Sequence, residues 1–297
     1  MDDFPDDLVR LIFAKCSAAT LASLECVSKR YKELARAVPL NLHVTPAQTP
    51  TAAWMDAHAD NVTKLTVRRV NPYTLHVFPN VAVIDVLYTT VKFWNDPNFC
   101  YLPFLKRLRV CHLSRRFGQP DVFRTSLLPP SLVDLFLTFD DTWRRVDIDQ
   151  SFPKMALRCR EWQMLFRQPD FHVTCLRNTK ELYLKTHGCI TTTVSKPTLI
   201  RKTVVECHDN FLPRGVLKWF GPALDTCVIK MPAASFVFSQ DLAHVNPASL
   251  TIEGTLVVAD VLGSHLRNLR IKAMRFASVA IPPDIDSEII VDDIIQG

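Results

Sequence analysis

The sequence predicts an α/β protein in which a small domain of three helices precedes an irregular repeat solenoid with a curved parallel sheet. Over residues 5–37, apolar side chains recur at the three- and four-residue spacing of helices. From residue 62 onward, the pattern apolar-x-x-apolar-x-apolar recurs along the chain. Of the 297 residues, 48% belong to the AVILMFWYC set and 22% are charged, which supplies a large core and excludes a mostly disordered chain.

The first predicted helix follows Pro5, a residue favoured at the start of a helix because its backbone needs no amide donor there. Two aspartates come next, where the helix dipole stabilises carboxylates. Leu8, Ile12 and Phe13 then fall on one helical face. The segment therefore predicts a short amphipathic helix.

Two further short helices are predicted after hydroxyl residues that can cap them, namely the segment Ser17 to Thr20 and Ser28. Their apolar positions are Leu21, Leu24 and Val27, then Tyr31, Leu34 and Ala35. A unit of about forty residues is near the size at which a hydrophobic core alone is insufficient. We therefore expect these helices to lean on the next domain or on a partner. The plain alternative is a helical cap that closes the end of a larger domain.

The residues of this segment resemble an F-box. The match comprises Phe4-Pro5-x-x-Leu8-Val9-x-x-Ile12-Phe13, followed by Leu21-x-x-Leu24-x-x-Val27-Ser28-Lys29-Arg30-Tyr31-x-x-Leu34. Phe4 stands where the family usually has Leu, Cys16 where a second Leu is common, and Tyr31 where Trp is typical.

The resemblance implies the substrate-recognition adaptor subunit of a Skp–cullin–F-box (SCF) ubiquitin ligase complex, a non-catalytic protein of the ubiquitin-like conjugation pathway. The adaptor-binding residues it implies are Phe4, Pro5, Leu8, Val9, Ile12, Phe13, Leu21, Leu24, Val27 and Tyr31. The alternative is a leucine-rich-repeat interaction scaffold unrelated to ubiquitin. Full coverage of Leu8, Ile12, Leu21 and Val27 by the chain's own repeats would favour the scaffold, whereas an exposed apolar patch would require a partner.

Eleven repeat units are predicted in residues 61–297. The units begin at Val62, Val81, Leu105, Leu132, Phe152, Thr179, Ile200, Leu224, Pro247, Leu266 and Asp286, on average 22.4 residues apart, and those at Thr179, Ile200, Pro247 and Asp286 have a non-ideal residue at one position of the pattern. This spacing lies in the ~20 to 29 residue range of leucine-rich repeats, and the segment from Leu128 to Leu132 resembles the opening of the FNIP type. We expect each unit to place two inward apolar residues on a short strand, with loop or short 3₁₀ backs. A mixed α+β domain of ordinary topology is the alternative.

The predicted domains are residues 1–38 for the helical F-box-like domain, 39–60 for a linker and docking helix, and 61–297 for the repeats. Three prolines mark the linker, and Trp54, Met55 and His58 at helical spacing mark the docking helix. The acidic, isoleucine-rich end of the chain suits a last strand that closes the solenoid.

The strand register predicts which side chains face outward on the concave side of the repeats. In the first five units these include several cations and few acids. The predicted substrate-binding residues are Arg107, Arg109, Lys154, Arg158 and Tyr183. Arginine forks bind carboxylates and phosphates in bidentate fashion, so we expect a protein substrate with an acidic or phosphorylated segment.

Other chemistry finds little support in the sequence. The net charge of +5 is too small for a nucleic-acid-binding stripe, and there is no glycine-rich phosphate loop, no HExxH motif and no CxxC pair. A catalytic Cys207-His208-Asp209 group or a zinc site from His187, Cys189, Cys207 and His208 is a remote alternative. We expect no catalytic residues, metal, cofactor, nucleic-acid partner or membrane partner. The acidic start and nine scattered cysteines predict a cytoplasmic or nuclear protein with free thiols.

Overall fold

The structure is a computed structural model. It describes residues 4–45, 51–69, 78–90, 102–115, 121–140, 142–159, 169–186, 190–194, 199–207, 223–231, 235–237, 247–260, 266–280 and 284–291. The chain forms two compact units, one of residues 1–113 with 127–133, the other of residues 114–126 with 134–297.

The first unit begins with three helices of eight residues each, α1 (Asp6–Phe13), α2 (Ala18–Glu25) and α3 (Lys29–Arg36). The predicted caps are present: the hydroxyl oxygens of Ser17 and Ser28 accept hydrogen bonds of 3.1 Å from backbone N–H groups three residues later. Phe13 and Tyr31 pack edge to face, with ring centroids 5.6 Å apart, in the small core that the helices share.

The segment expected to be a linker carries a strand as well as a helix. Residues Leu40–Val44 form β1, which pairs in parallel with β2 (Val62–Arg69), and its alternating buried side chains continue the hydrophobic pattern of the sheet. The expected docking helix is α4 (Ala52–His58), followed by the 3₁₀ turn η1 (Ala59–Asn61). The sheet of the repeats therefore starts before the predicted boundary at residue 61.

A buried histidine connects α4 to the three N-terminal helices. His58 Nε2 lies 2.7 Å from Glu25 Oε1 of α2, Arg36 Nε of α3 lies 3.5 Å from Glu25 Oε2, and Trp54 stacks on the imidazole. Burial lowers the pKa of His58 below its usual value of 6.5, and the Glu25 carboxylate opposes this effect. The contact joins the small helical domain to the start of the sheet within one unit.

The remaining strands of the first unit are β3 (Val83–Thr90) and β4 (Arg107–Ser114), and the strand order is β1-β2-β3-β4. Leu65 and Val67 pair with Ile84 and Val86 as the repeat pattern predicts. The Ser131 hydroxyl donates to the carbonyls of Leu102 and Leu105, which ties the turn after residue 127 to the coil that carries β4.

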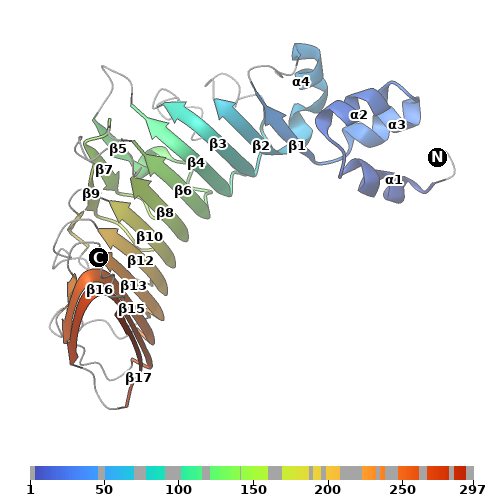
Figure 1. Ribbon diagram of the computed structural model, residues 1–297. Coiled ribbons are helices and arrows are strands. Elements are labelled where there is room, and N and C mark those ends of the chain that lie inside the picture. The colour runs from blue at the N-terminus through green and yellow to red at the C-terminus, as the bar shows by residue number, and fades with distance from the viewer. Residues whose placement is uncertain are drawn as a thin grey trace, which may run out of the picture. The chain divides into compact units, whose positions relative to one another are not determined.

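The second unit is a parallel β-solenoid with two sheets. Its main sheet has the order β6-β8-β10-β12-β13-β15-β16-β17, with β14 beside β15, and the back sheet has the order β5-β7-β9-β11. Figure 1 shows the strands of the main sheet side by side, with β5, β7 and β9 across the coil from them. The main strands are β6 (Asp134–Phe139), β8 (Lys154–Cys159), β10 (Glu181–Thr186), β12 (Lys202–Cys207), β13 (Thr226–Met231), β14 (Ser235–Val237), β15 (Ser249–Asp260), β16 (Asn268–Ala280) and β17 (Asp286–Val291).

The back sheet differs from the expected loops and 3₁₀ turns. It consists of β5 (Val122–Arg124), β7 (Arg145–Ile148), β9 (Asp170–Val173) and β11 (Ile190–Thr192), with the short turn η5 (Thr125–Leu127) after β5. Large aromatic side chains fill the coil between the two sheets, and the rings of Phe123, Phe139, Trp143 and Phe171 contact one another edge to face. Aromatic rings therefore form the core between the two sheets of these coils.

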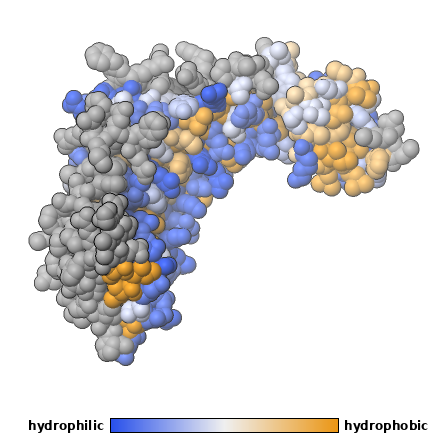
Figure 2. Space-filling view, in the orientation of Figure 1, coloured by the Kyte–Doolittle hydropathy of each residue, from blue (hydrophilic) through white to orange (hydrophobic). Residues whose placement is uncertain are grey.

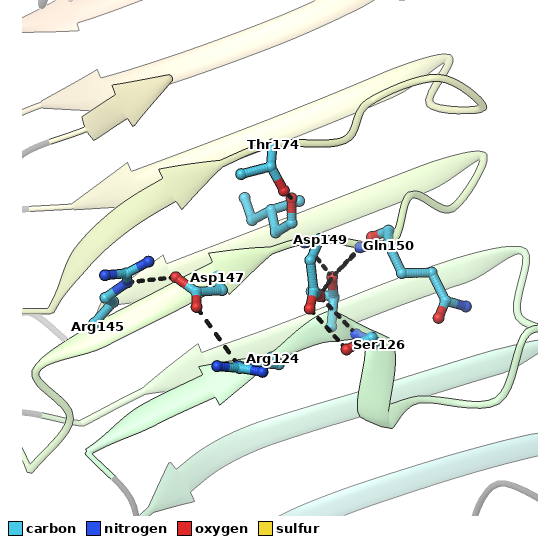
Figure 3. A network of polar contacts seen from close by, with 9 residues as sticks. Arg124, Ser126, Arg145, Asp147, Asp149, Gln150 and Thr174 are labelled. Atoms are coloured by element: carbon cyan, nitrogen blue, oxygen red, sulfur yellow. Dashed lines mark hydrogen bonds and ion pairs between the residues drawn. The ribbon is translucent and has the colours of Figure 1, made fainter. Parts of the chain in front are cut away.

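Polar side chains connect neighbouring coils at the back sheet (Figure 3). The Thr125 hydroxyl oxygen accepts a 2.8 Å hydrogen bond from the backbone N–H of Gln150, and Asp149 accepts one of 2.8 Å from the N–H of Ser126. Asp147 of β7 forms ion pairs with two exposed arginines, Arg124 of the neighbouring β5 and Arg145 of its own strand. The network satisfies backbone groups where one coil passes to the next.

The predicted register holds through β16 and is wrong for the last unit. Leu135, Met155, Leu182, Thr203, Cys227, Leu250 and Leu269 occupy one buried row across the main sheet. At β17, Asp286 pairs with Asn268 and Ile289 with Ile271, so the strand is shifted by two residues from the expected alignment. A two-residue shift keeps the same side chains on the same face, which is why the hydrophobic pattern did not distinguish the two registers.

Candidate functional site

The first candidate surface lies on the three N-terminal helices. Leu8, Leu11 and Ile12 of α1 are 46%, 65% and 49% exposed, and Val27 after α2 is 66% exposed. Figure 2 shows hydrophobic side chains gathered over these helices, whereas hydrophilic ones follow the strands. Single exposed apolar residues are ordinary, but a group of them on one small domain marks an interaction surface.

Local contacts keep this surface in place. The Arg30 side chain of α3 donates hydrogen bonds of 3.0 and 2.8 Å to Asp6 Oδ1 and another to the carbonyl of Phe4, so the start of α1 is held against α3. Beneath the exposed residues, Val9 and Phe13 point into the domain and are buried. The helices are therefore ordered by their own core and caps, and their apolar outer side chains are left facing solvent.

The second candidate surface is the outward face of the main sheet in the second unit. One row of this face reads Thr138, Arg158, Lys185, Glu206, Lys230, Glu253 and Lys272, one residue from each successive strand. Lys185 Nζ lies 2.7 Å from Glu206 Oε1, and Lys230 and Lys272 lie 2.8 and 3.6 Å from the two Glu253 oxygens. Burial raises the pKa of Glu253, but the two lysines outweigh it and the net shift is downward.

Arg158 differs from the other cations of this row because aromatic rings contact it in place of a carboxylate. Its guanidinium carbon lies 5.0 Å from the ring centroid of Phe136 on β6 and 4.3 Å from that of Tyr183 on β10. The Tyr183 hydroxyl donates a 3.0 Å hydrogen bond to Glu206. Burial and the Glu206 carboxylate raise the pKa of Tyr183 above its usual value of 10.0, so the phenol remains protonated and donates.

The five predicted substrate residues fall in different units. Arg107 and Arg109 are exposed on β4 in the first unit, while Lys154, Arg158 and Tyr183 lie on β8 and β10 in the second. Within the second unit the structure brings Arg158 and Tyr183 together, and it pairs Lys154 with Glu181 at 3.3 Å. Phe136 is not among the five predicted residues, although the register places it in the same outward row as Tyr183.

The remote catalytic and zinc alternatives fall mostly on positions that the structure does not describe. His187, Cys189, His208 and Asp209 lie outside the described residues. Cys207 is buried at the end of β12, and in the described part of the chain no three metal-ligating side chains come together. Among the described residues no helix is long and apolar enough to cross a membrane.

Residues 1–43 match the model of the F-box domain family. This match supports an F-box protein, and the name F-box is used below for this part of the chain. No curated protein and no solved structure matches the chain. The F-box domain is the general mark of SCF substrate adaptors, it binds Skp-type adaptors, and proteins that carry it are typically non-catalytic.

The structure divides the ten adaptor-binding residues implied by the resemblance into an inner and an outer set. The inner set, which packs inside the F-box, is Val9, Phe13, Leu21 and Tyr31. The outer set is Phe4, Pro5, Leu8, Ile12 and Val27, all exposed, with Leu24 half-buried. Only the outer set is open to a partner, and the inner set supports it from below.

Leu11 is exposed beside the outer set, and the sequence analysis did not include it among the adaptor-binding residues. It lies three residues after Leu8 and next to Ile12, so the three side chains share one face of α1. The spacing of Leu8, Leu11 and Ile12 is visible in the sequence, but the F-box pattern does not include Leu11. Leu11 is one of the two most exposed apolar residues of the F-box in the described chain.

Proposed function

We propose that this chain is the substrate-recognition subunit of an SCF ubiquitin ligase. In this role its F-box binds a Skp-type adaptor, and through it a cullin, while the solenoid binds a protein substrate. The chain itself catalyses no step, and it acts in the cytoplasm or nucleus. We also propose that its repeats are of the leucine-rich type, on the basis of their period and buried rows.

The observation that carries the proposal is the exposed apolar surface of the F-box. The scaffold alternative requires the chain's own repeats to cover Leu8, Ile12, Leu21 and Val27. Leu21 is buried, but the other three are about half exposed or more. An apolar group of this kind gains free energy when a partner removes it from water, at ~25 cal/mol per Å². In the scaffold alternative these helices are only the N-terminal cap of the repeats and have no partner of their own.

The adaptor arm is tested by co-expressing the chain with a Skp-type adaptor and measuring co-purification. In the double variant Leu8→Asp and Ile12→Asp, two carboxylates enter an interface that excludes water, and capture should be lost. Leu199→Asp is the matched control, because Leu199 is 62% exposed in the second unit. Capture by the double variant at the control's level would exclude the F-box surface as the adaptor site.

The substrate arm rests on the solenoid face. We propose that acidic or phosphorylated segments of the substrate contact Arg107 and Arg109 in the first unit and Lys154, Arg158 and Tyr183 in the second. Replacing Arg109 and Arg158 by Glu should lose the substrate and retain the adaptor, because the reversed charges repel an anion and leave the F-box untouched. Quantitative comparison of the proteins captured by the two forms checks this, and an unchanged set would assign the substrate site to other residues.

A further inference from the structure

Arg158 and the two rings beside it form a binding group on the outward face of the second unit. Phe136 and Tyr183 both align with Ala156, which lies between them on β8. Strands two apart are separated by about 9.6 Å, and the alanine side chain between the rings is too small to fill the space between them. Arg158, two residues further along the same strand, contributes the guanidinium that contacts both rings.

The charge of Arg158 is not neutralised by the described chain. No carboxylate of the described residues lies within ion-pair distance of it, and its Nε is buried without a hydrogen-bond partner among them. The nearest acid of its row, Glu206, binds Lys185 and the Tyr183 hydroxyl. A buried donor without a partner costs free energy, and no acceptor among the described residues offsets this cost.

The geometry suits a planar oxyanion. A guanidinium can make two parallel N–H···O hydrogen bonds to a carboxylate, and contact with two rings restricts its conformations in advance, which lowers the entropy lost on binding. The side chain is partly exposed on a sheet face that an extended peptide can follow. Lysine, as a point charge without a fork, would not reproduce this geometry.

The local charge selects between two kinds of oxyanion. Lys185 and Glu206, the next two residues of the row, form an ion pair with each other, so the local charge that remains among these three described residues is the +1 of Arg158. A carboxylate carries one negative charge and balances this group, whereas a phosphoryl group carries about −1.5 to −2 at neutral pH. A phosphate would leave negative charge beside Glu206.

We infer that Arg158, positioned by Phe136 and Tyr183, binds the side-chain carboxylate of an Asp or Glu in an extended segment of the substrate protein. The inference rests on the proposed function, because it identifies the chemistry of the substrate that the solenoid takes. It selects the acidic rather than the phosphorylated substrate, and it makes Phe136 a positioning residue of the site.

The test uses oriented peptide libraries passed over the immobilised 297-residue chain. The central residue is Glu, Gln or phosphoserine, and the flanking positions are degenerate. The Glu library should be retained about tenfold more than the Gln library, the ratio expected for a charged hydrogen bond. It should also exceed the phosphoserine library.

Variants assign the preference to this site. Arg158→Gln should abolish the difference between Glu and Gln libraries, and Arg201→Gln, which removes an exposed arginine away from the rings, should preserve it. Arg158→Lys keeps the charge and should retain only part of the preference, which keeps the test meaningful if Arg158→Gln fails to fold. Tyr183→Leu should reduce the preference through loss of the ring.

Equal retention of the Glu and Gln libraries, including no retention of either, would overturn the inference. Stronger retention of the phosphoserine library would overturn the carboxylate assignment in favour of phosphate. Adaptor capture, measured on the same protein preparations, reports on the proposed function separately. A protein that captures the adaptor but shows no preference for Glu would retain the ligase role and lose this site.

Discussion

The F-box and the solenoid of the second unit differ in the kind of side chain that they expose to water. In the F-box, the polar groups are used internally as helix caps and the Arg30–Asp6 contact, while Leu8, Leu11 and Ile12 remain exposed. In the second unit the apolar rows are buried and the outward face carries paired charges. The first region leaves apolar side chains in contact with water, whereas the second presents mostly charged and polar ones.

The difference shows where recognition can arise in each region. The F-box surface is apolar, so affinity there depends on the area removed from water. The solenoid face is charged and largely neutralised by its own ion pairs, so recognition depends on the few groups that lack a counter-charge. Arg158 is such a group, because it contacts two rings and forms no ion pair with a carboxylate of the described residues.

The largest expected effect comes from removing a ring inside the second unit. Phe139→Ala opens a cavity among Phe123, Trp143 and Phe171 and should lower the free energy of unfolding by about 3 to 5 kcal/mol. Leu11→Ala, on the exposed F-box surface, should change it by less than about 0.5 kcal/mol. Urea denaturation followed by circular dichroism measures both, and equal losses would contradict the contrast between the two regions.

A smaller effect is expected where polar groups connect the coils. Thr125 is fully buried, and its hydroxyl accepts from the N–H of Gln150. Thr125→Val keeps the shape but leaves that N–H without its partner, so it should cost about 1 to 3 kcal/mol. The exposed Thr191→Val in β11 is the control and should be neutral within about 0.5 kcal/mol. A neutral Thr125→Val would show that water replaces the hydroxyl.

The smallest effect concerns the contact between the F-box and α4. Because the pKa of His58 in the folded chain lies below 6.5, the unfolded chain binds the proton more readily in the interval between the two values. The His58 contribution to stability is therefore present above about pH 6.5 and is lost as the pH falls through the folded pKa. Each tenfold difference in the proton affinity of His58 between the folded and unfolded chains changes the free energy of unfolding by at most ~1.4 kcal/mol. Urea midpoints at several pH values measure it, and His58→Gln should flatten this dependence. An equal slope in the variant would assign the effect to other groups.

Much of the local structure could be predicted from short patterns in the sequence. Ser17 and Ser28 cap the helices that they were expected to cap, because capping involves residues three apart in the chain. All eleven predicted units carry a strand, and even Thr203, a polar residue in an apolar position, is buried in its row. The F-box match at residues 1–43 likewise agrees with the resemblance seen in the residues.

The sequence by itself determined the helices, their caps, the repeat period and the apolar rows, since each depends on neighbours within a few residues or on a regular spacing. Tertiary structure decided which side of each helix faces water, so that Leu8 is exposed while Val9 is buried. It also decided the strand at residues 40–44, the back sheet and the register of β17, because strand pairing joins residues about twenty apart whose alignment the pattern leaves open. The pairing of Arg158 with Phe136 and Tyr183 arises in the same way, from three successive coils that meet only after the chain has folded.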